Sequence, residues 1–481
     1  MGLFEEGGHM SPATVLEFRQ PRSSQSEGTS TERFRQVMHE ELDKMIDRLA
    51  VVFEEGRRPS LAELSDMITE VRQEFLGSCL QHLVEEKYGP EAEQESSPCP
   101  QCGKICSKRR VVAKKLETMQ GPCDLKRTWF YCTDCGRGFT PLDTVAEISR
   151  RERQFDVQKR CVKLAAQVPF ACASEIFEDL TGQKVSDHFI HDVFEDVGAQ
   201  ASLEEVVPDR SEIERRIEDV TSGKWRPILV VASDGAHLPT RPKSRRDAKR
   251  GAGQYKEAKG FRIYLAGKER IVHLASWHQI QNEEQFGIDL ALAAQRIPQE
   301  KVRIALLGDG ADWLWKHMTA SFPTGCEVLD FYHCAEHVHE VAKAQYGEKS
   351  PNALEWAEAT LCRLFFGEVG HCIAGLRRMK PKTRQAGEII RKFAAYLQKH
   401  RDRLNYRSRR LGGYPIGSGG IESANKFICH TRMKRSGAWW VKETGNAMLR
   451  IRCAIYNGTY DRVFDRYRQA SIAKQGTSLW A

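Results

Sequence analysis

The sequence predicts a multidomain α/β protein, and three observations lead to this fold class. The chain has 481 residues, which is too long for a single hydrophobic core. Its first half is mainly of helical periodicity, interrupted by two Cys-X-X-Cys motifs that mark a small metal-stabilised module. In its second half, apolar runs of strand length alternate with helical segments, as in sheets covered by helices.

The first 95 residues are expected to form a mobile arm and a helical hairpin. Residues 1–30 are rich in Ser, Gly, Pro and Arg and lack a periodic apolar pattern. In residues 31–95, two apolar runs with helical spacing flank a break at residues 56–60. We expect this hairpin to serve oligomerisation, with DNA contact as the alternative.

Residues 96–148 are predicted to form a zinc ribbon. The ligands would be Cys99, Cys102, Cys132 and Cys135. Each Cys-X-X-Cys turn can direct two thiolates at one Zn²⁺, so the two turns complete a tetrahedral site. Cys106 and Cys123 are spare thiols that could replace a ligand. The stretch 99–135 has 8 basic and 3 acidic residues, so the ribbon could read DNA or be purely structural.

Residues 149–222 are expected to be helical and to resemble a helix-turn-helix unit. A helical run around Ala173 is followed by a turn at Thr181-Gly182, and Ser186 then provides an N-cap for a second helix. The pattern alone fits a helical connector as well as a DNA-binding domain.

Residues 223–334 and 411–455 are predicted to form the α/β core. Strands are expected at 227–232, 260–265, 271–276, 302–307 and 326–330, with a helix at 283–296 after the third. Three strands, a helix and further strands are the order of a ribonuclease-H-like fold, in which helices cover both faces of a mixed sheet. The helical periodicity of residues 335–410 predicts a helical insertion. Residues 456–481 are expected to be a basic C-terminal tail.

Three carboxylates are the candidate catalytic residues of this core. Asp234 and Asp309 each follow a predicted strand, and Glu422 follows a glycine-rich turn at the start of a helix. Oxygen ligands of this kind suit Mg²⁺ or Mn²⁺, and two such ions can promote in-line phosphodiester chemistry. Asp234 would bridge the ions, while Asp309 and Glu422 would each hold one. Alternatively, the Asp-Gly steps simply mark turns.

A second polar cluster contains Asp330, His333 and His337. The two histidines are four residues apart, on one helical face, which is a spacing that can bind zinc. We instead expect His333 to order the site by hydrogen bonding to a phosphate oxygen, with a buried structural histidine as the alternative.

The positive charge of the chain is concentrated near its C-terminus, which indicates a polyanionic partner. The chain carries 73 Lys and Arg against 65 Asp and Glu, and residues 401–481 alone hold 16 basic and 5 acidic residues. A loop at 238–260 is also basic. The expected DNA contacts are Lys426, Arg432, Lys434, Arg435, Trp439, Trp440, Lys442, Arg241, Lys243, Arg245 and Arg246. At least one of the two tryptophans is expected to lie in the core.

Four of these stretches resemble bacterial insertion-sequence transposases of the ISKra type, within the wider Mutator-like group. They are Asp234-Gly-Ala-His, Gly308-Asp309-Gly-Ala-Asp, Asp330-Phe-Tyr-His333 and Gly417-Ser-Gly-Gly-Ile-Glu422-Ser-Ala-Asn-Lys. The resemblance extends from about Cys99 to Arg452. It implies that Asp234, Asp309 and Glu422 form a DDE triad and that Asp330 and His333 match the family's Asp-X-X-His motif. Gly420 stands where the family form has proline.

The resemblance implies a transposase that binds the ends of its element and the target as double-stranded DNA. It would act as a homo-oligomer, expected to be a dimer, nicking DNA by metal-dependent hydrolysis and joining 3′ hydroxyls to the target. A structure-directed nuclease and a catalytically silent DNA-binding protein are the alternatives. No apolar stretch reaches 18 residues and no signal sequence is evident, so we expect a cytoplasmic, nucleoid-associated protein without membrane contact.

Overall fold

The computed structural model describes residues 29–54, 56, 58–221, 226–243, 253–267 and 270–475. The chain divides into two compact units, Met1–Gly89 and Pro90–Ala481. Most of the expected arm, residues 1–28, lies outside the described residues, as do the expected DNA contacts Arg245 and Arg246. No helix in the described ranges is long and apolar enough to cross a membrane.

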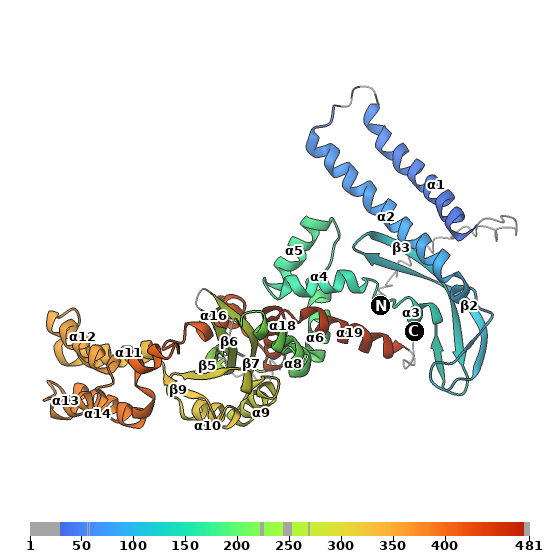
Figure 1. Cartoon of the computed structure of the whole chain (residues 1–481). Helices are drawn as coiled ribbons and strands as arrows, with labels where there is room; N and C mark the ends of the chain where they lie inside the picture. The colour runs from blue at the N-terminus through green and yellow to red at the C-terminus, as the bar shows by residue number, and fades with distance from the viewer. Residues whose placement is uncertain are drawn as a thin grey trace, which may run out of the picture. The chain divides into compact units, whose positions relative to one another are not determined.

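The first unit contains the predicted helical hairpin (Figure 1). Its elements are α1 (Ser30–Ala50), the 3-10 turn η1 (Val51–Phe53) and α2 (Leu61–Ala92), which continues into the second unit. A capping box starts α1: Glu32 N–H donates to Thr29 Oγ1 (3.3 Å), and Thr29 N–H donates to the Glu32 carboxylate (2.7 Å). No residue of α1 is buried, so the hairpin leaves its apolar side chains partly exposed.

The second unit begins with a four-stranded antiparallel sheet in the predicted ribbon region. Its strands are β1 (Ser96–Pro98), β2 (Ile105–Thr118), β3 (Gly121–Cys132) and β4 (Arg137–Phe139), followed by the short helix α3 (Pro141–Val145). Strands β2 and β3 form a long hairpin (Figure 1). The core near its cysteine end is small and consists of Cys99, Cys106, Phe130, Cys132 and Phe139.

A group of helices follows the ribbon. They are α4 (Phe155–Ala165), α5 (Phe170–Thr181), α6 (Asp187–Gln200), α7 (Leu203–Val206) and α8 (Arg210–Glu218). Gly182 ends α5 in the left-handed conformation with φ 71°, and Ser186 Oγ accepts the N–H of Phe189 at 3.2 Å to cap α6. The predicted succession of helix, glycine turn and capped helix is therefore confirmed.

The central sheet has the strand order β7-β6-β5-β8-β9. Its strands are β5 (Ile228–Thr240), β6 (Gln254–Ala266), β7 (Ile271–Ile280), β8 (Arg303–Gly308) and β9 (Cys326–Leu329); α9 (Glu283–Ala294), the 3-10 turn η2 (Gln299–Lys301) and α10 (Asp312–Ser321) connect them. Strands β5, β6 and β7 are antiparallel neighbours, whereas β8 and β9 run parallel to β5. Every predicted strand and the predicted helix are present.

One strand is longer than predicted. The sequence indicated that the first strand ends near residue 232, but β5 continues through Asp234 to Thr240. The reason is that β6 pairs with β5 along its whole length, from Ile228↔Ala266 to Thr240↔Gln254. Residues 238–240 and 254–260 of the expected loop therefore belong to paired strands.

The predicted insertion is helical. It comprises α11 (Phe331–Tyr346), α12 (Pro351–Phe365), α13 (Val369–Arg378), α14 (Arg384–Lys399), the 3-10 turn η3 (Arg401–Arg403) and α15 (Tyr406–Leu411). The chain then continues through α16 (Gly419–Asn425), the π-helical turn η4 (Lys426–His430), α17 (Thr431–Met433), α18 (Lys442–Asn457) and α19 (Tyr460–Ala473). In Figure 1, α11 to α14 extend away from the sheet, whereas α16 and α18 lie against it.

The expectation of a C-terminal tail is wrong for the residues of α19. Tyr460, Val463, Phe464 and Tyr467 are buried on one face of this helix. Their spacing is that of a helix, but the surrounding arginines and aspartates masked it in the sequence.

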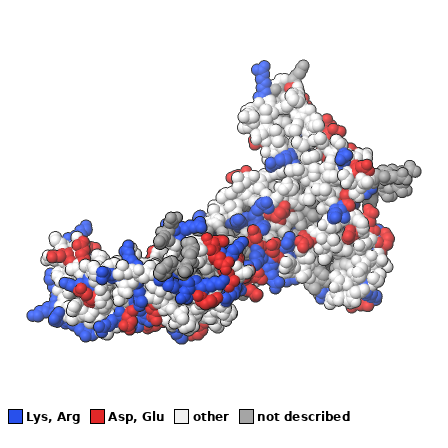
Figure 2. Space-filling model, viewed as in Figure 1, with Lys and Arg blue, Asp and Glu red and all other residues white. Residues whose placement is uncertain are grey.

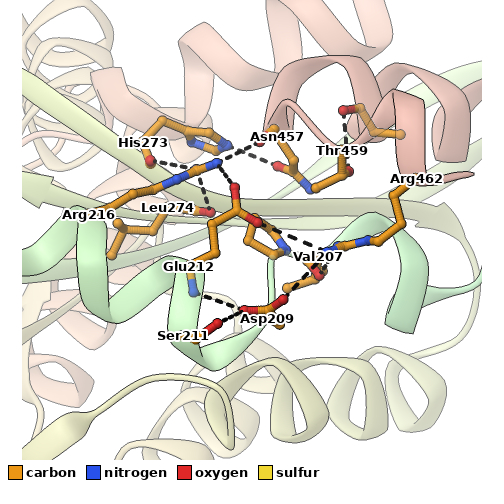
Figure 3. Close-up of polar contacts among 12 residues, drawn as sticks. Val207, Asp209, Ser211, Glu212, Arg216, His273, Leu274, Asn457, Thr459 and Arg462 are labelled. Atoms are coloured by element: carbon orange, nitrogen blue, oxygen red, sulfur yellow. Dashed lines mark hydrogen bonds and ion pairs between the residues drawn. The ribbon is translucent and has the colours of Figure 1, made fainter.

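A polar cluster fixes the C-terminal helices to the sheet (Figure 3). The Asn457 amide oxygen accepts the N–H of Ser276 at 2.8 Å, and its amide nitrogen donates to Val206 O at 2.9 Å. Arg216 donates to Asn457 O at 3.1 Å and to His273 O at 3.2 Å. Because these partners belong to β7, α7 and α8, the end of α18 is held from several sides.

Candidate active site and metal centre

Asp234 lies on β5, and Asp309 directly follows the neighbouring parallel strand β8. The last register pair of β5 and β8 is Ala232↔Leu307. Asp234 is two residues after Ala232, and Asp309 is two residues after Leu307. Neighbouring strands are about 4.8 Å apart, so the two residues lie close together at the point where β8 ends. Asp234 Oδ1 accepts the N–H of Gly235 at 2.7 Å, and Asp309 Oδ1 accepts the N–H of Ala311 at 3.0 Å.

Glu422 reaches the same region from α16. Ser418 Oγ donates to Glu422 Oε1 at 2.5 Å, which orients the exposed carboxylate. Asp234 and Glu422 both line a pocket of about 550 Å³. The other lining residues are Asn425, Lys426, His430 and Thr431. The two predicted carboxylates Glu422 and Asp234 therefore face one cavity.

The three carboxylates interact electrostatically. Burial raises the pKa of Asp234 to about 6, and the nearby charges of Asp309, Glu422 and Glu257 add to the increase. A site of this kind gains from a bound proton or cation. The three carboxylates form an open set, because among the described residues only the four ribbon cysteines bring three or more ligand atoms within 4.8 Å of one another.

Asp330 holds the turn that precedes Glu422. Its side chain is 1% exposed. Oδ1 accepts the N–H of His333 at 2.6 Å and caps α11, while Oδ2 accepts the N–H of Ser418. The His333 ring is 38% exposed and lies 3.4 Å from Glu336, so it is not the buried histidine of the alternative interpretation.

The structure explains why glycine occupies position 420. A Cβ on Gly420 would lie 2.6 Å from the ring of Tyr264. The Gly420 carbonyl also accepts a hydrogen bond from Arg262 Nη1 at 2.5 Å. Proline would therefore collide with the tyrosine ring, although proline itself suits the first turn of a helix.

Two residues of the site were not predicted. Asn425 Nδ2 donates to Asp234 Oδ2 at 2.6 Å, and Tyr396 Oη donates to the backbone carbonyl of Asp309 at 2.8 Å. Asn425 is three residues after Glu422, so helical spacing could have placed both on one face. Tyr396 belongs to α14 of the insertion, and nothing in its local sequence indicates a contact with β8.

The expected DNA contacts divide into exposed and buried residues. Lys426, Lys434, Arg435, Trp439, Lys442, Arg241 and Lys243 are exposed. Arg432 and Trp440 are only 4% and 8% exposed. Arg432 Nε donates to Ala165 O at 3.0 Å, and its guanidinium lies 5.4 Å from the Phe170 ring and 5.1 Å from the Trp440 ring. These two side chains belong to the core and have no surface for DNA.

The helix-turn-helix-like unit has an acidic outer face. On α6, the capped second helix, Asp192, Glu195 and Asp196 are exposed. Carboxylates in these positions would repel a phosphate backbone. The structure therefore favours the connector interpretation, in which α6 packs against α4, α5 and α18.

The four ribbon cysteines form a group that could bind a metal such as zinc. Their sulfur atoms all lie within 4.8 Å of one another. Cys99 Sγ is 3.9 Å from Cys135 Sγ, and Cys102 Sγ is 3.6 Å from Cys132 Sγ. Tetrahedral zinc with bonds of about 2.3 Å places its sulfur ligands about 3.8 Å apart, so this donor set fits Zn²⁺. The spare thiols Cys106 and Cys123 are buried and are not members of this group, although Cys106 packs in the same small core as Cys99 and Cys132.

Comparisons with known proteins complete the description. No curated protein matches the chain. Among solved structures, the Drosophila P element transposase strand transfer complex aligns with 10% sequence identity and a TM-score of 0.23, covering 65% of this chain and 80% of that chain. A likeness this weak carries no argument. The model of an uncharacterised protein family, UPF0236, matches residues 60–469, and because this range is most of the chain, the protein belongs to the UPF0236 family.

Proposed function

We propose that this protein is a DDE transposase of the insertion-sequence type that its motifs resemble. It would bind the ends of its element, nick DNA by hydrolysis and join the 3′ hydroxyl to target DNA. One observation carries the proposal: Asp234 on β5 and Asp309, directly after the parallel strand β8, both stand two residues beyond the register pair Ala232↔Leu307, and Glu422 enters the same region from α16. The strand order β7-β6-β5-β8-β9 supports a ribonuclease-H-like core.

The chemistry of the donors supports Mg²⁺ or Mn²⁺ at this site. All three groups are carboxylates, which are the preferred ligands of these ions. Burial raises the pKa of Asp234, and the negative charges of Asp309, Glu422 and Glu257 raise it further. A bound cation would offset this repulsion. When bound, a pair of divalent ions activates the attacking oxygen and stabilises the leaving oxygen. Because two ions would share the set, all three carboxylates need not fit around one centre.

The protein's own residues would position the phosphate. Lys426 and His430 line the pocket with Asp234 and Glu422, so their side chains can contact the non-bridging oxygens of a phosphodiester. Both side chains belong to the π-helical turn Lys426–His430, and such turns are frequent at functional sites. Ser418 keeps the Glu422 carboxylate directed to the site through its hydroxyl.

An exposed aromatic and cationic surface beside the site suits nucleic acid. Trp439 and Tyr255 are 43% and 66% exposed and meet edge to face, with ring centroids 6.0 Å apart. Backbone hydrogen bonds from Arg241 N to Trp440 O (2.8 Å) and from Trp440 N to Pro239 O (3.0 Å) fix this pair on the extension of β5 and β6. A rigid aromatic edge can stack on an unpaired base.

Unpaired cations flank Trp439 in the sequence, between Lys426 and Lys442. Within the described residues, Lys426, Lys434 and Lys442 take part in no ion pair and are exposed. Figure 2 shows that basic side chains on the face in view form groups interspersed with acidic ones. The unpaired lysines are therefore more informative than the total charge, because a cation without an acidic partner is free to neutralise a DNA phosphate and release the counterions condensed there.

The test is strand transfer with pre-cut DNA ends that carry a free 3′ hydroxyl. A transposase joins these ends to a target plasmid in the presence of Mg²⁺ or Mn²⁺, and Asp309→Asn abolishes joining while DNA binding persists. Cleavage without joining would identify a structure-directed nuclease. DNA binding with no divalent-cation uptake by calorimetry would identify a catalytically silent DNA-binding protein.

A further inference from the structure

We propose that Asn425 is a positioning residue that fixes the orientation of the Asp234 carboxylate, and that His278 holds the Asn425 amide in place. Asn425 Nδ2 donates to Asp234 Oδ2 at 2.6 Å, and Asn425 Oδ1 lies 2.8 Å from His278 Nε2. Asn425 is 3% exposed and His278 is fully buried. This inference rests on the proposed function, in which Asp234 is a metal ligand.

Asp234 and His278 lie in one row of register pairs across the sheet, and Asn425 reaches both from α16. Asp234 on β5 pairs with Gly260 on β6, and Gly260 pairs with His278 on β7. His278 is therefore two strands away from Asp234, and an ordinary side chain at position 260 would separate them. A Cβ on Gly260 would lie 2.0 Å from the His278 ring. The absence of a side chain at this position therefore leaves the space in which the ring reaches Asn425.

Hydrogen-bond chemistry sets the direction of this chain. An ionised carboxylate only accepts, so the amide nitrogen of Asn425 must face Asp234 and its oxygen must face His278. The imidazole must then donate from Nε2, which leaves Nδ1 as an acceptor for the Cys453 thiol, 3.9 Å away. Burial lowers the pKa of His278 to about 4 and raises that of Cys453, which keeps the ring neutral and the thiol protonated.

The consequence is a carboxylate that cannot rotate freely. Oδ1 of Asp234 accepts from Gly235 N–H and Oδ2 accepts from Asn425, so each oxygen is held by one donor. Loss of a residue that hydrogen-bonds to a metal ligand typically lowers metal affinity by about 10–100-fold. Asn425 would act in this way because its own position is fixed by His278.

The first measurement is Mn²⁺ binding to the full-length protein by electron paramagnetic resonance, with Asn425→Ala compared with wild type. We expect Mn²⁺ affinity to fall about 10–100-fold, with DNA affinity close to wild type. The variant should fold with lower stability, because buried His278 loses its partner. Thr444→Ala is the matched control, because it removes a polar contact of α18 at the surface, to Glu195. Wild-type Mn²⁺ affinity in Asn425→Ala would overturn the inference.

The second measurement needs no metal and separates this inference from the proposed function. In protein labelled with ¹⁵N-histidine, the Nε2–H resonance of His278 is assigned by its loss in His278→Gln. Asp234→Asn is expected to shift this resonance in wild type but not in the Asn425→Ala background. If the wild type binds no Mn²⁺ and this coupling is present, the proposed function fails and the positioning stands. An unchanged resonance would overturn the positioning.

Discussion

The carboxylate of Asp330 accepts the backbone N–H of Ser418, a residue 88 positions later in the chain. The same carboxylate caps α11 through His333 N–H, so one buried side chain joins the beginning of the insertion to the turn after its end. Ser418 in turn donates its hydroxyl to Glu422. The residue that closes the insertion thus also orients the third carboxylate of the proposed site.

Removing the Asp330 carboxylate should therefore impair folding and activity together. We expect Asp330→Ala to lower the free energy of unfolding by about 2–3 kcal/mol, because two backbone N–H groups lose a buried charged acceptor. Chemical denaturation measures this loss. The control Ser418→Ala keeps the backbone N–H and removes only the hydroxyl, so its stability should stay near wild type while Mg²⁺-dependent activity falls. Equal destabilisation by both variants would contradict this division.

Asp234 should make stability depend on pH. Its folded-state pKa of about 6 lies above the ordinary aspartate value of 3.8, so the folded state binds the proton more tightly than the unfolded state. The free energy of unfolding should then fall as pH rises from about 4 to 6 in the absence of metal. Asp234→Asn removes the buried charge and should raise the melting temperature at pH 8 but not at pH 4.

The control for this experiment is Asp179→Asn, which removes an exposed carboxylate on α5. Its melting temperature should follow the wild type at both pH values. Addition of Mg²⁺ should stabilise the wild type at pH 8 and have no effect on Asp234→Asn. A wild-type melting temperature that does not change across this pH range would show that burial and the neighbouring carboxylates do not raise the pKa of Asp234.

Zinc removal should unfold the ribbon and leave the central sheet folded. The cysteine end of the ribbon has a core of only five residues, too small to be stable without a cross-link or a metal. We expect one zinc per chain by elemental analysis, and loss of that zinc in Cys132→Ser. Limited proteolysis should then cut within residues 96–139. The control Cys123→Ser, outside the four-cysteine group, should retain the metal.

Two nearby arginines should behave in opposite ways. Arg435 is exposed, so Arg435→Gln should weaken DNA binding and reduce the slope of log affinity against log salt by about 1. Arg432 is buried against Ala165 and Phe170, so Arg432→Gln should instead lower stability by about 2 kcal/mol and leave the slope unchanged. Fluorescence anisotropy at several salt concentrations measures both slopes, and equal slopes for the two variants would refute the assignment.

The hairpin should mediate self-association. Leu42 and Ile46 are 40% and 53% exposed on one face of α1, which contains no buried residue, and exposed apolar helices gain by pairing. Replacing both with Glu should convert a dimer to a monomer in analytical ultracentrifugation. The control Asp43→Lys alters charge on the same helix without removing apolar surface, and it should remain dimeric.

Local sequence patterns determined most of the fold, and the failures have physical causes. Apolar runs located all five strands of the central sheet, but not the extension of β5, because Gly235 and Pro239 interrupt the pattern that β6 then supports by pairing. Cys-X-X-Cys spacing located the four-cysteine group. The charges of α19 concealed its buried face until packing was known.

The sequence identified site residues where an acidic side chain stands next to a strand or a turn. Asp234, Asp309 and Glu422 were found because each is an acid next to a strand or a glycine turn. Their roles as catalytic residues remain predictions. Asn425 and Tyr396 contact the site through hydrogen bonds that depend on how distant elements pack, and such contacts leave little trace in a local pattern. Burial of Arg432 was missed for the same reason.

The contact between Gly420 and Tyr264 has an evolutionary consequence. The tyrosine ring fills the space that a proline at position 420 would need, so the two positions cannot change independently. Relatives that carry proline at 420 should have a small residue at 264, and relatives with an aromatic residue at 264 should keep glycine. Sequence covariation between these two columns would therefore test whether the start of the Glu422 helix and the Tyr264 ring are coupled.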